Sequence, residues 1–174
     1  KNIIKKYCKN KNQSTIADIG CGNGWGTEEL NKEVFIDMAT GYDGAPQMIQ
    51  KAKKTYTGID FFKTDLNNWN PDKKFNIIYS MEVIYYLNDP ERFISNCYNK
   101  WLKSGGLFIA AIDHYKENKE STNWPEECGV YMNTKTKKEW IEMLINVGFV
   151  NIKSWQVCKK ENWQGTLVIM GNKK

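Results

Sequence analysis

The stretch that decides the fold is Asp18–Gly24, which reads Asp-Ile-Gly-Cys-Gly-Asn-Gly. Glycines at alternate positions let the backbone approach a ligand closely and turn N–H groups toward it. The short apolar run Ile16–Ile19 leads into these glycines, and polar, helix-forming residues follow at Thr27–Lys32. This order predicts a strand, a tight ligand-binding loop and a helix.

The glycine spacing argues against a dinucleotide cofactor. The GxGxxG fingerprint needs glycine at its sixth position, which is Trp25 counted from Gly20 and Thr27 counted from Gly22. A carboxylate at Asp18 would also repel a pyrophosphate, whereas it would attract an ammonium group. The loop therefore favours a ligand that carries a positive charge.

The rest of the chain continues the alternation of strands and helices. Further strands are expected to end at Asp43 and to span Ile59–Lys63, Phe75–Met81, Leu107–Ile112, Phe149–Val157 and Gly165–Met170, and helices to span Ala45–Thr55, Pro90 to the stop at Ser104-Gly105-Gly106, and the segment from the Thr136/Glu139 capping box to Gly148. The last two strands are joined by a turn too short for a crossover helix, so they are expected to be antiparallel. The pattern predicts an α/β fold with a doubly wound, mostly parallel seven-stranded sheet, an antiparallel edge hairpin and a single domain over 1–174.

Ligands of such sheets bind outside the carboxyl ends of the strands. The segments that end strands are therefore expected to share one cleft, namely 18–24, 43, 65, 80–86 and 113–115. Residues 114–133 show no hydrophobic period, and a loop of this length in a compact domain is more often functional than idle. We expect this loop to be a lid over the substrate, with Trp124, Tyr131 and Met132 as walls of the substrate pocket.

Composition limits the classes of function. The chain has 174 residues, of which 41% are hydrophobic and 26% charged, and no apolar stretch is long enough to span a membrane. The net charge of +5 comes from scattered lysines with Arg92 as the one arginine, which argues against a nucleic-acid partner. The five cysteines form no CxxC pair, so neither a zinc site nor a redox motif is expected, and a reducing cytoplasm is the expected location.

The segment Asp18–Gly24 resembles motif I of the class I S-adenosylmethionine-dependent methyltransferases, and the resemblance extends from Ile16 to Met170. It implies a Rossmann-like fold, S-adenosyl-L-methionine as cofactor and S-adenosyl-L-homocysteine as product. The turn Leu102–Leu107 resembles the LKPGG turn of the family, with Ser104 in place of proline. The residues that the resemblance places at the cofactor are Asp18, Gly20, Cys21, Gly22, Asn23, Gly24, Asp43, Gly44, Met48, Thr64, Asp65, Leu66, Ser80 and Met81.

The resemblance also assigns roles within this set. Asp43 would hold the ribose hydroxyls, Asp65 and Met48 would lie by the adenine, and Ser80-Met81 would line the methionine moiety. Each residue also has a purely structural interpretation: Asp43 as a helix cap, Asp65 as a turn residue and Met48 as part of the core. The structural interpretation of Asp18 is that it partners a helix N-terminus. Cys21 is expected to be a small filler rather than a nucleophile.

Methyl transfer from a sulfonium is an in-line displacement, so proximity, orientation and exclusion of water supply most of the rate. A base is needed only when the acceptor must lose a proton. His114 is the candidate base, with an exposed loop histidine as the alternative. Glu82 and Tyr86 are candidates to orient or desolvate an amine acceptor, or are merely structural. Asp113 and His114 are too few ligands for a metal, and none is expected.

The sequence thus predicts a methyltransferase that acts on an N, O or S atom of a small-molecule acceptor. No Asn/Asp-Pro-Pro-aromatic tetrapeptide follows the fourth strand, which argues against amino groups of nucleic-acid bases. Two alternatives stay open at this point: methylation of RNA or protein, and a non-catalytic regulatory module that binds S-adenosylmethionine. The oligomeric state is left open.

Overall fold

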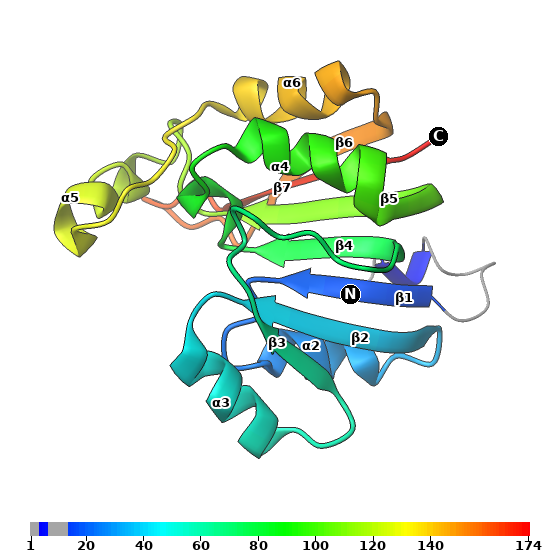
Figure 1. Ribbon diagram of the computed structural model, residues 1–174. Helices are drawn as coiled ribbons and strands as arrows, with labels where there is room; N and C mark the ends of the chain where they lie inside the picture. Colours follow the sequence, from blue (N-terminus) through cyan, green and yellow to red (C-terminus); the bar gives the residue numbers. More distant parts are fainter. Residues whose placement is uncertain (1–3, 7–13) are drawn as a thin grey trace.

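The computed structural model describes residues 4–6 and 14–174. Its centre is a seven-stranded sheet with the order β3-β2-β1-β4-β5-β7-β6 (Figure 1). The strands are β1 (Ser14–Ile19), β2 (Ile36–Asp43), β3 (Asp60–Lys63), β4 (Phe75–Met81), β5 (Leu102–Ile112), β6 (Val150–Val157) and β7 (Thr166–Asn172). Strands β1 to β5 pair in parallel, β7 is antiparallel to β5, and β6 is antiparallel to β7. This arrangement confirms the predicted doubly wound sheet with an antiparallel edge hairpin.

Helices cover both faces of the sheet because the central strands are apolar on both sides. On β4, Ile78 belongs to the core cluster under α4 and α6, whereas the neighbouring Ile77 belongs to the cluster on the opposite face. The four main helices are α2 (Trp25–Asn31), α3 (Pro46–Thr55), α4 (Pro90–Asn96) and α6 (Lys137–Val147). Figure 1 shows α4 and α6 together on one face and α2 behind β2 and β3.

The segment after α4 differs from the prediction. The helix continues only as a π-helical turn, η2 (Cys97–Trp101), and β5 begins at Leu102. Leu102 pairs with Phe75, and the register then shifts so that Leu107 pairs with Ile77. The predicted helix stop at Ser104-Gly105-Gly106 is therefore wrong: these residues belong to a bulge in β5. The buried Leu102 side chain joins the sheet core, which ends the helix sooner than the glycines would.

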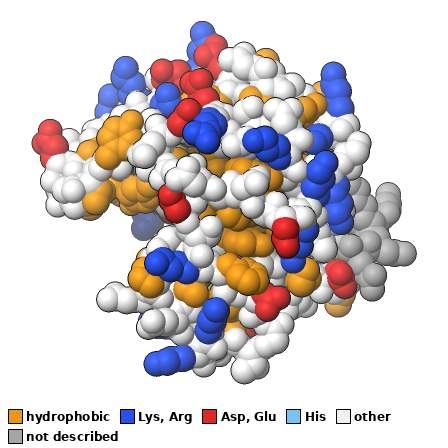
Figure 2. Space-filling model, viewed as in Figure 1, with side chains coloured by type: hydrophobic (Ala, Val, Ile, Leu, Met, Phe, Trp, Pro, Cys, Tyr) orange, Lys and Arg blue, Asp and Glu red, His pale blue; other side chains and the backbone are white. Residues whose placement is uncertain are grey.

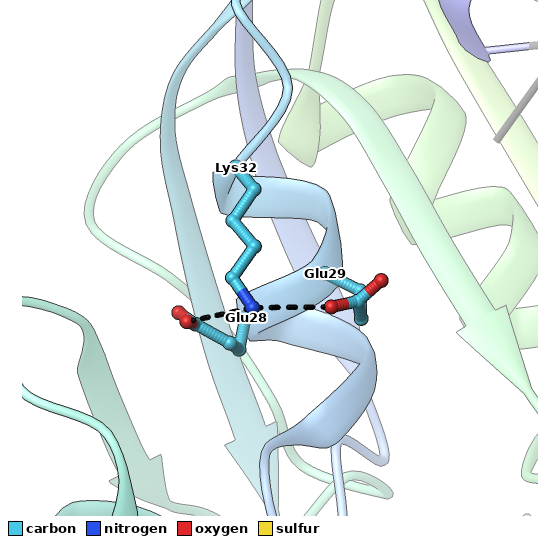
Figure 3. Close-up of polar contacts among 3 residues, drawn as sticks. All are labelled: Glu28, Glu29 and Lys32. Carbon is cyan, nitrogen blue, oxygen red and sulfur yellow. Dashed lines mark hydrogen bonds and ion pairs between the residues drawn. The ribbon is translucent and has the colours of Figure 1, made fainter.

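Helix α2 directly follows the loop Asp18–Gly24 and packs against the sheet. Lys32 at its end forms ion pairs with Glu28 and Glu29, each at 3.2 Å between the Lys32 Nζ and a carboxylate oxygen (Figure 3). Water screens these exposed pairs, so they contribute little to stability. The buried side chains Thr27 and Leu30 instead fix α2 against the sheet, and with it the loop.

The predicted capping box of α6 is confirmed, since Thr136 and Glu139 exchange both hydrogen bonds and Gly148 ends the helix at φ 103°. The segment 114–133 before α6 contains two short helices, η3 (Lys119–Ser121) and α5 (Trp124–Cys128). Figure 1 shows α5 standing out beyond the carboxyl ends of β4 and β5. The segment thus lies at the end of the sheet where the cleft was predicted.

The surface has mixed charge. Figure 2 shows Lys, Arg, Asp and Glu side chains spread over the face of α4 and α6, with hydrophobic side chains gathered toward its centre. None of the helices in residues 4–6 and 14–174 is long and apolar enough to cross a membrane.

Candidate cofactor site and acceptor cleft

The glycine-rich loop encloses a cavity of about 140 Å³ at the carboxyl ends of β1 and β4. Both strands end beside it, so side chains from β1, β4 and α2 converge there. The lining residues are Asp18, Gly20, Cys21, Gly22, Asn23, Trp25, Gly26, Tyr79 and Met81. Six of these nine were predicted from the sequence to bind the cofactor: Asp18, Gly20, Cys21, Gly22, Asn23 and Met81.

Two glycines shape the loop for different reasons. Gly22 has φ +53°, and a Cβ added there would meet no protein atom within 4 Å, so its backbone faces open space. Gly20 has φ +76°, and a Cβ there would collide with the side chain of Val83. The loop is thus open on the side of Gly22 and packed against the end of β4 on the side of Gly20. Cys21 is buried in a cluster with Ile49 and Phe61, which confirms the small-filler interpretation.

Asp43 ties the end of β2 to this loop. Its Oδ2 accepts a hydrogen bond from the Gly22 N–H at 2.8 Å, and its Oδ1 accepts one from the Ala45 N–H at 2.7 Å. Ala45 itself is the N-cap of α3, without a side-chain capping bond, so Asp43 is not the cap of that helix. Each carboxylate oxygen keeps a lone pair for a further donor such as a hydroxyl.

Asp18 is a buried carboxylate, 3% exposed, at the base of the cavity. Its Oδ2 accepts a hydrogen bond from the Thr27 hydroxyl at 2.7 Å. Burial raises the pKa of Asp18 to about 7, the Thr27 bond opposes this, and the charge of Asp43 adds to it. A cationic ligand group beside Asp18 would favour the ionised form. The open space at Gly22, the buried Asp18 and the free lone pairs of Asp43 therefore fit a ligand with an ammonium group and hydroxyls.

Ser80 does not present its side chain to the cavity. Its hydroxyl is buried and donates to the Ile19 carbonyl at 3.1 Å, which links β4 to β1. The Ser80 hydroxyl is therefore engaged within the sheet, and the place of Ser80 at the cofactor stays a prediction. Met81, in contrast, lines the cavity, and the Tyr79 hydroxyl donates to its sulfur at 3.3 Å.

The predicted adenine end lies where β2 and β3 finish side by side. The Thr64 N–H donates to the Asp43 carbonyl at 2.9 Å, and a Cβ on Gly44 would lie 3.6 Å from the Thr64 carbonyl oxygen. Met48 is 46% exposed, so its core interpretation is wrong. Leu66 is half-buried against the main core.

The carboxylate oxygens of Asp65 accept hydrogen bonds from residues of the same turn. Its Oδ2 accepts from the Asn68 amide at 2.7 Å and its Oδ1 from the Asn67 N–H at 3.0 Å, and these bonds lower its pKa. These contacts match the turn interpretation of Asp65, and nothing in the structure tests its predicted place by the adenine.

His114 differs from both sequence interpretations. It is completely buried, its Nδ1 lies 2.8 Å from the Ser121 carbonyl oxygen and its Nε2 lies 2.8 Å from the Thr134 hydroxyl. The ring therefore has no free nitrogen for an acceptor, and it is not an exposed loop histidine. Burial lowers its pKa, against the bond to Ser121. The ring also lies face to face with Trp124, with centroids 6.3 Å apart. His114 thus links the start of the segment 114–133 to Ser121 within the segment and to Thr134 just after it.

Glu82 directly follows β4 with φ 59°, a backbone conformation unusual for a residue with a side chain. Its Oε2 accepts hydrogen bonds from the Tyr85 hydroxyl at 3.0 Å and from the Asp113 N–H at 3.1 Å. Tyr86 is 43% exposed, whereas Tyr85 is buried. Sequence reasoning chose Tyr86 and missed Tyr85, because only the 3₁₀ turn η1 (Ile84–Tyr86) decides which tyrosine turns inward. It placed Asp113 in the cleft but gave it no part in binding the acceptor.

Sequence reasoning also missed Trp25, Gly26 and Tyr79 as cavity residues and Thr27 as the partner of Asp18. The spacing of Thr27 nine residues after Asp18 carries no motif, so the pattern gave no signal for it. Of the predicted acceptor walls, Met132 is buried in the main core and Tyr131 is 63% exposed. Trp124 stacks between His114 and Trp163. In the described part of the chain, no group of three or more His, Cys, Asp or Glu side chains is placed to hold a metal ion.

Comparisons with known proteins identify the family of this chain. A family model described as a methyltransferase domain matches residues 2–154. Trans-aconitate 2-methyltransferase of Escherichia coli is 27% identical over 107 residues, which cover 62% of this chain and 42% of that protein. Malonyl-acyl-carrier-protein O-methyltransferase of Haemophilus influenzae is 26% identical over 140 residues, which cover 79% of this chain and 51% of that protein. The chain spans about half the length of the curated relatives it matches.

Among solved structures, Phosphoethanolamine N-methyltransferase 2 of Haemonchus contortus, in complex with S-adenosyl-L-methionine, has a TM-score of 0.78 at 16% identity. The match covers 99% of this chain and 51% of that one, and at this identity it shows the fold. The sheet order and the family match together define a Rossmann-like methyltransferase domain. The chain belongs to the methyltransferase domain family.

Proposed function

We propose that the protein transfers a methyl group from S-adenosylmethionine to an N, O or S atom of a small-molecule acceptor. The observation that carries the proposal is the hydrogen bond from the Gly22 N–H to Asp43, which joins the open glycine loop to the acid at the end of β2. It places a carboxylate with free lone pairs beside a backbone that a ligand can approach.

In this proposal the cavity and the ends of β2 and β3 beside it each bind one part of the donor. Asp18 holds the ammonium group, Asp43 holds the ribose hydroxyls, and Met81 lines the methionine chain. The backbone of Gly20–Gly24 forms the wall of the pocket. Gly44, Met48, Thr64, Asp65 and Leu66 form the adenine end, in the order that the family resemblance implies.

When bound, S-adenosylmethionine supplies a methyl group on a positively charged sulfur, which is ready for displacement. The protein then has to bring an acceptor atom in line with the methyl group and exclude water. Glu82 and Tyr86 at the end of β4 are the residues placed to orient the acceptor, and segment 114–133 covers it. His114 acts by anchoring that segment rather than as a base.

The relatives act on different acceptors according to their names, trans-aconitate in one case and malonyl-acyl-carrier protein in another. Their low identity leaves the acceptor of this protein to be found by assay. A pool of amines, hydroxyl compounds, thiols and carboxylic acids with radiolabelled methyl donor is the direct screen.

Titration calorimetry tests the donor site first. We expect S-adenosylmethionine and S-adenosylhomocysteine to bind with micromolar affinity, and a nicotinamide dinucleotide not to bind. Gly22→Val should weaken donor binding by about a hundredfold or more, because the side chain would fill the open space that the donor needs.

Gly58→Val is the matched control. Gly58 also has positive φ, at +77°, and open space around its Cβ position, but it lies in the turn before β3. Both variants should lose similar stability from backbone strain, and only Gly22→Val should lose the donor. Unchanged donor affinity in a folded Gly22→Val protein would overturn the placement of the donor.

A further inference from the structure

Glu82 and Asp113 are held together at the ends of two neighbouring parallel strands. β4 and β5 pair up to Met81 and Ala111, and the Glu82 N–H then donates to the Ala111 carbonyl at 2.9 Å. The Asp113 N–H donates in return to the Glu82 Oε2 at 3.1 Å. The backbone of Asp113 therefore holds the Glu82 carboxyl group at the ends of the two strands, and Asp113 carries the second carboxyl group beside it.

One oxygen of each carboxyl group has no partner. Glu82 Oε1 and Asp113 Oδ1 are both buried atoms without a hydrogen bond. A buried acceptor without a donor is costly, and such atoms call for a functional explanation. Within residues 4–6 and 14–174, no lysine or arginine forms a salt bridge with either group. The two oxygens therefore lack a donor that the described chain could supply.

The pair lies next to the donor cavity. Met81, the residue before Glu82, lines that cavity, and Val83, the residue after it, packs against Gly20 of the donor loop. Glu82 thus directly follows a residue of the cavity, and Asp113 is bonded to Glu82 through its N–H. Two carboxyl groups there repel a carboxylate acceptor, whereas they supply acceptor oxygens for N–H groups.

We propose, on the basis of the function proposed above, that Glu82 and Asp113 together bind and deprotonate an amine, so that the acceptors of this protein are amines rather than carboxylic acids. Asp113 is a catalytic residue in this proposal beside Glu82, and Tyr85 is a positioning residue that holds the Glu82 carboxyl group. The acceptor would then differ in class from trans-aconitate and malonyl-acyl-carrier protein, which the names of the two relatives give as their acceptors.

The proton balance is simple. The bound ammonium group gives one proton to the carboxylate pair, which frees the nitrogen lone pair. The nitrogen then forms a bond to the methyl carbon while the carbon–sulfur bond breaks and its electron pair stays on sulfur. The product leaves as the methylated ammonium ion, and the pair returns its proton to water.

The surroundings of Glu82 make it a suitable base. Burial and then the charge of Asp113 raise its pKa to about 8, while the bonds from Tyr85 and the Asp113 N–H oppose the rise. The titratable groups that face Glu82 are Asp113, Tyr85 and Tyr79. A carboxyl group with this pKa binds a proton far more strongly than an ordinary glutamate.

The first test compares two acceptor pools with tritiated methyl donor. One pool holds ethanolamine, histamine, tryptamine and spermidine, and the other holds trans-aconitate, malonate, indole-3-acetate and salicylate. We expect label in the amines at about a hundredfold or more over the acids. Glu82→Gln and Asp113→Asn should each lower it by at least about tenfold, whereas Asp37→Asn, an exposed acid at the start of β2, should not.

The second test does not depend on turnover. Carbon-13 NMR of protein with labelled glutamate carboxyl groups follows the titration of Glu82, assigned by its loss in Glu82→Gln. We expect a midpoint near pH 8 that moves to lower pH in Asp113→Asn, because the neighbouring charge is removed. The pH dependence of kcat/KM for a labelled amine should shift in the same direction.

Failure of this inference can be distinguished from failure of the proposed function. Label in the acids, or in neither pool while S-adenosylmethionine binds normally, would overturn the amine proposal and leave the donor site intact. A Glu82 titration midpoint near that of an ordinary glutamate, and unchanged in Asp113→Asn, would also overturn it. Absence of donor binding would instead refute the proposed function itself.

Discussion

At the scale of single residues, Asp18 links the chemistry of the loop to pH. Its raised pKa of about 7 means that much of this carboxyl group is neutral below neutral pH when no ligand is bound. A donor ammonium group needs the ionised form. We therefore expect S-adenosylmethionine to bind about tenfold more weakly near pH 6 than it would bind the protein with a fully ionised Asp18, because about a tenth of the protein is then competent.

Calorimetry across this range checks the expectation, and Asp18→Asn is its control. The variant should bind the donor weakly at every pH and lose the pH dependence. An affinity for the donor that stays constant between pH 6 and pH 8 in the native protein would contradict the role of Asp18.

The effect of Asp18 on stability has the opposite sign. Its pKa in the folded protein lies above the ordinary value of 3.8, so the folded state binds the proton more strongly than the unfolded state. The contribution of Asp18 to stability is then most favourable below about pH 4 and falls as the pH rises toward 7. In the proposed complex the donor would offset this loss, because it would supply a positive charge next to the ionised group.

At the scale of elements, the segment 114–133 depends on His114. Both ring nitrogens bond to positions along or just beyond the segment, to Ser121 and to Thr134. His114→Ala would leave these two groups unpartnered and open a cavity, at a cost of about 2–3 kcal/mol. We expect limited proteolysis to cut the segment faster in this variant than in Lys116→Ala, which changes an exposed side chain.

The pH dependence of the segment follows from the same contacts. Burial lowers the pKa of His114, so the charged form is disfavoured in the folded protein. The penalty appears as the pH falls below the ordinary value of 6.5. Cutting should therefore speed up on acidification in the native protein. A rate of cutting that is the same with and without His114 would show that other contacts hold the segment.

At the scale of the whole molecule, the charge distribution favours a small acceptor. In the view of Figure 2, positive and negative side chains are mixed over the upper part of the face of α4 and α6, and positive side chains line its right-hand edge. Proteins that make several phosphate contacts lose about a thousandfold or more in affinity between 50 and 200 mM salt. We expect kcat/KM of this protein to change by less than about threefold over that range.

A steep fall with salt would contradict a small acceptor and favour RNA. The same assay with added RNA as competitor gives an independent reading, since a small-acceptor enzyme should not be inhibited. Donor affinity measured at each salt concentration separates an effect on the acceptor from one on the donor site.

The sequence by itself determined the sheet and the donor loop of this protein. Alternation of apolar runs with amphipathic segments is a local property, and so is the glycine pattern of Asp18–Gly24, so both could be read without coordinates. The capping box at Thr136 was equally local. The end of the helix after α4 was not a local property, because Leu102 pairs with a distant strand and the helix ends before Gly105 and Gly106.

Only the tertiary structure decided the arrangement of side chains beyond the ends of β4 and β5. Whether Tyr85 or Tyr86 turns inward, whether His114 has a free nitrogen and whether Ser80 reaches the cavity depend on partners far away in the chain. The pairing of Glu82 with Asp113 joins residues 31 positions apart, with no motif between them. Such side chains acquire their chemistry from burial and from neighbours that packing supplies, and a linear pattern contains neither.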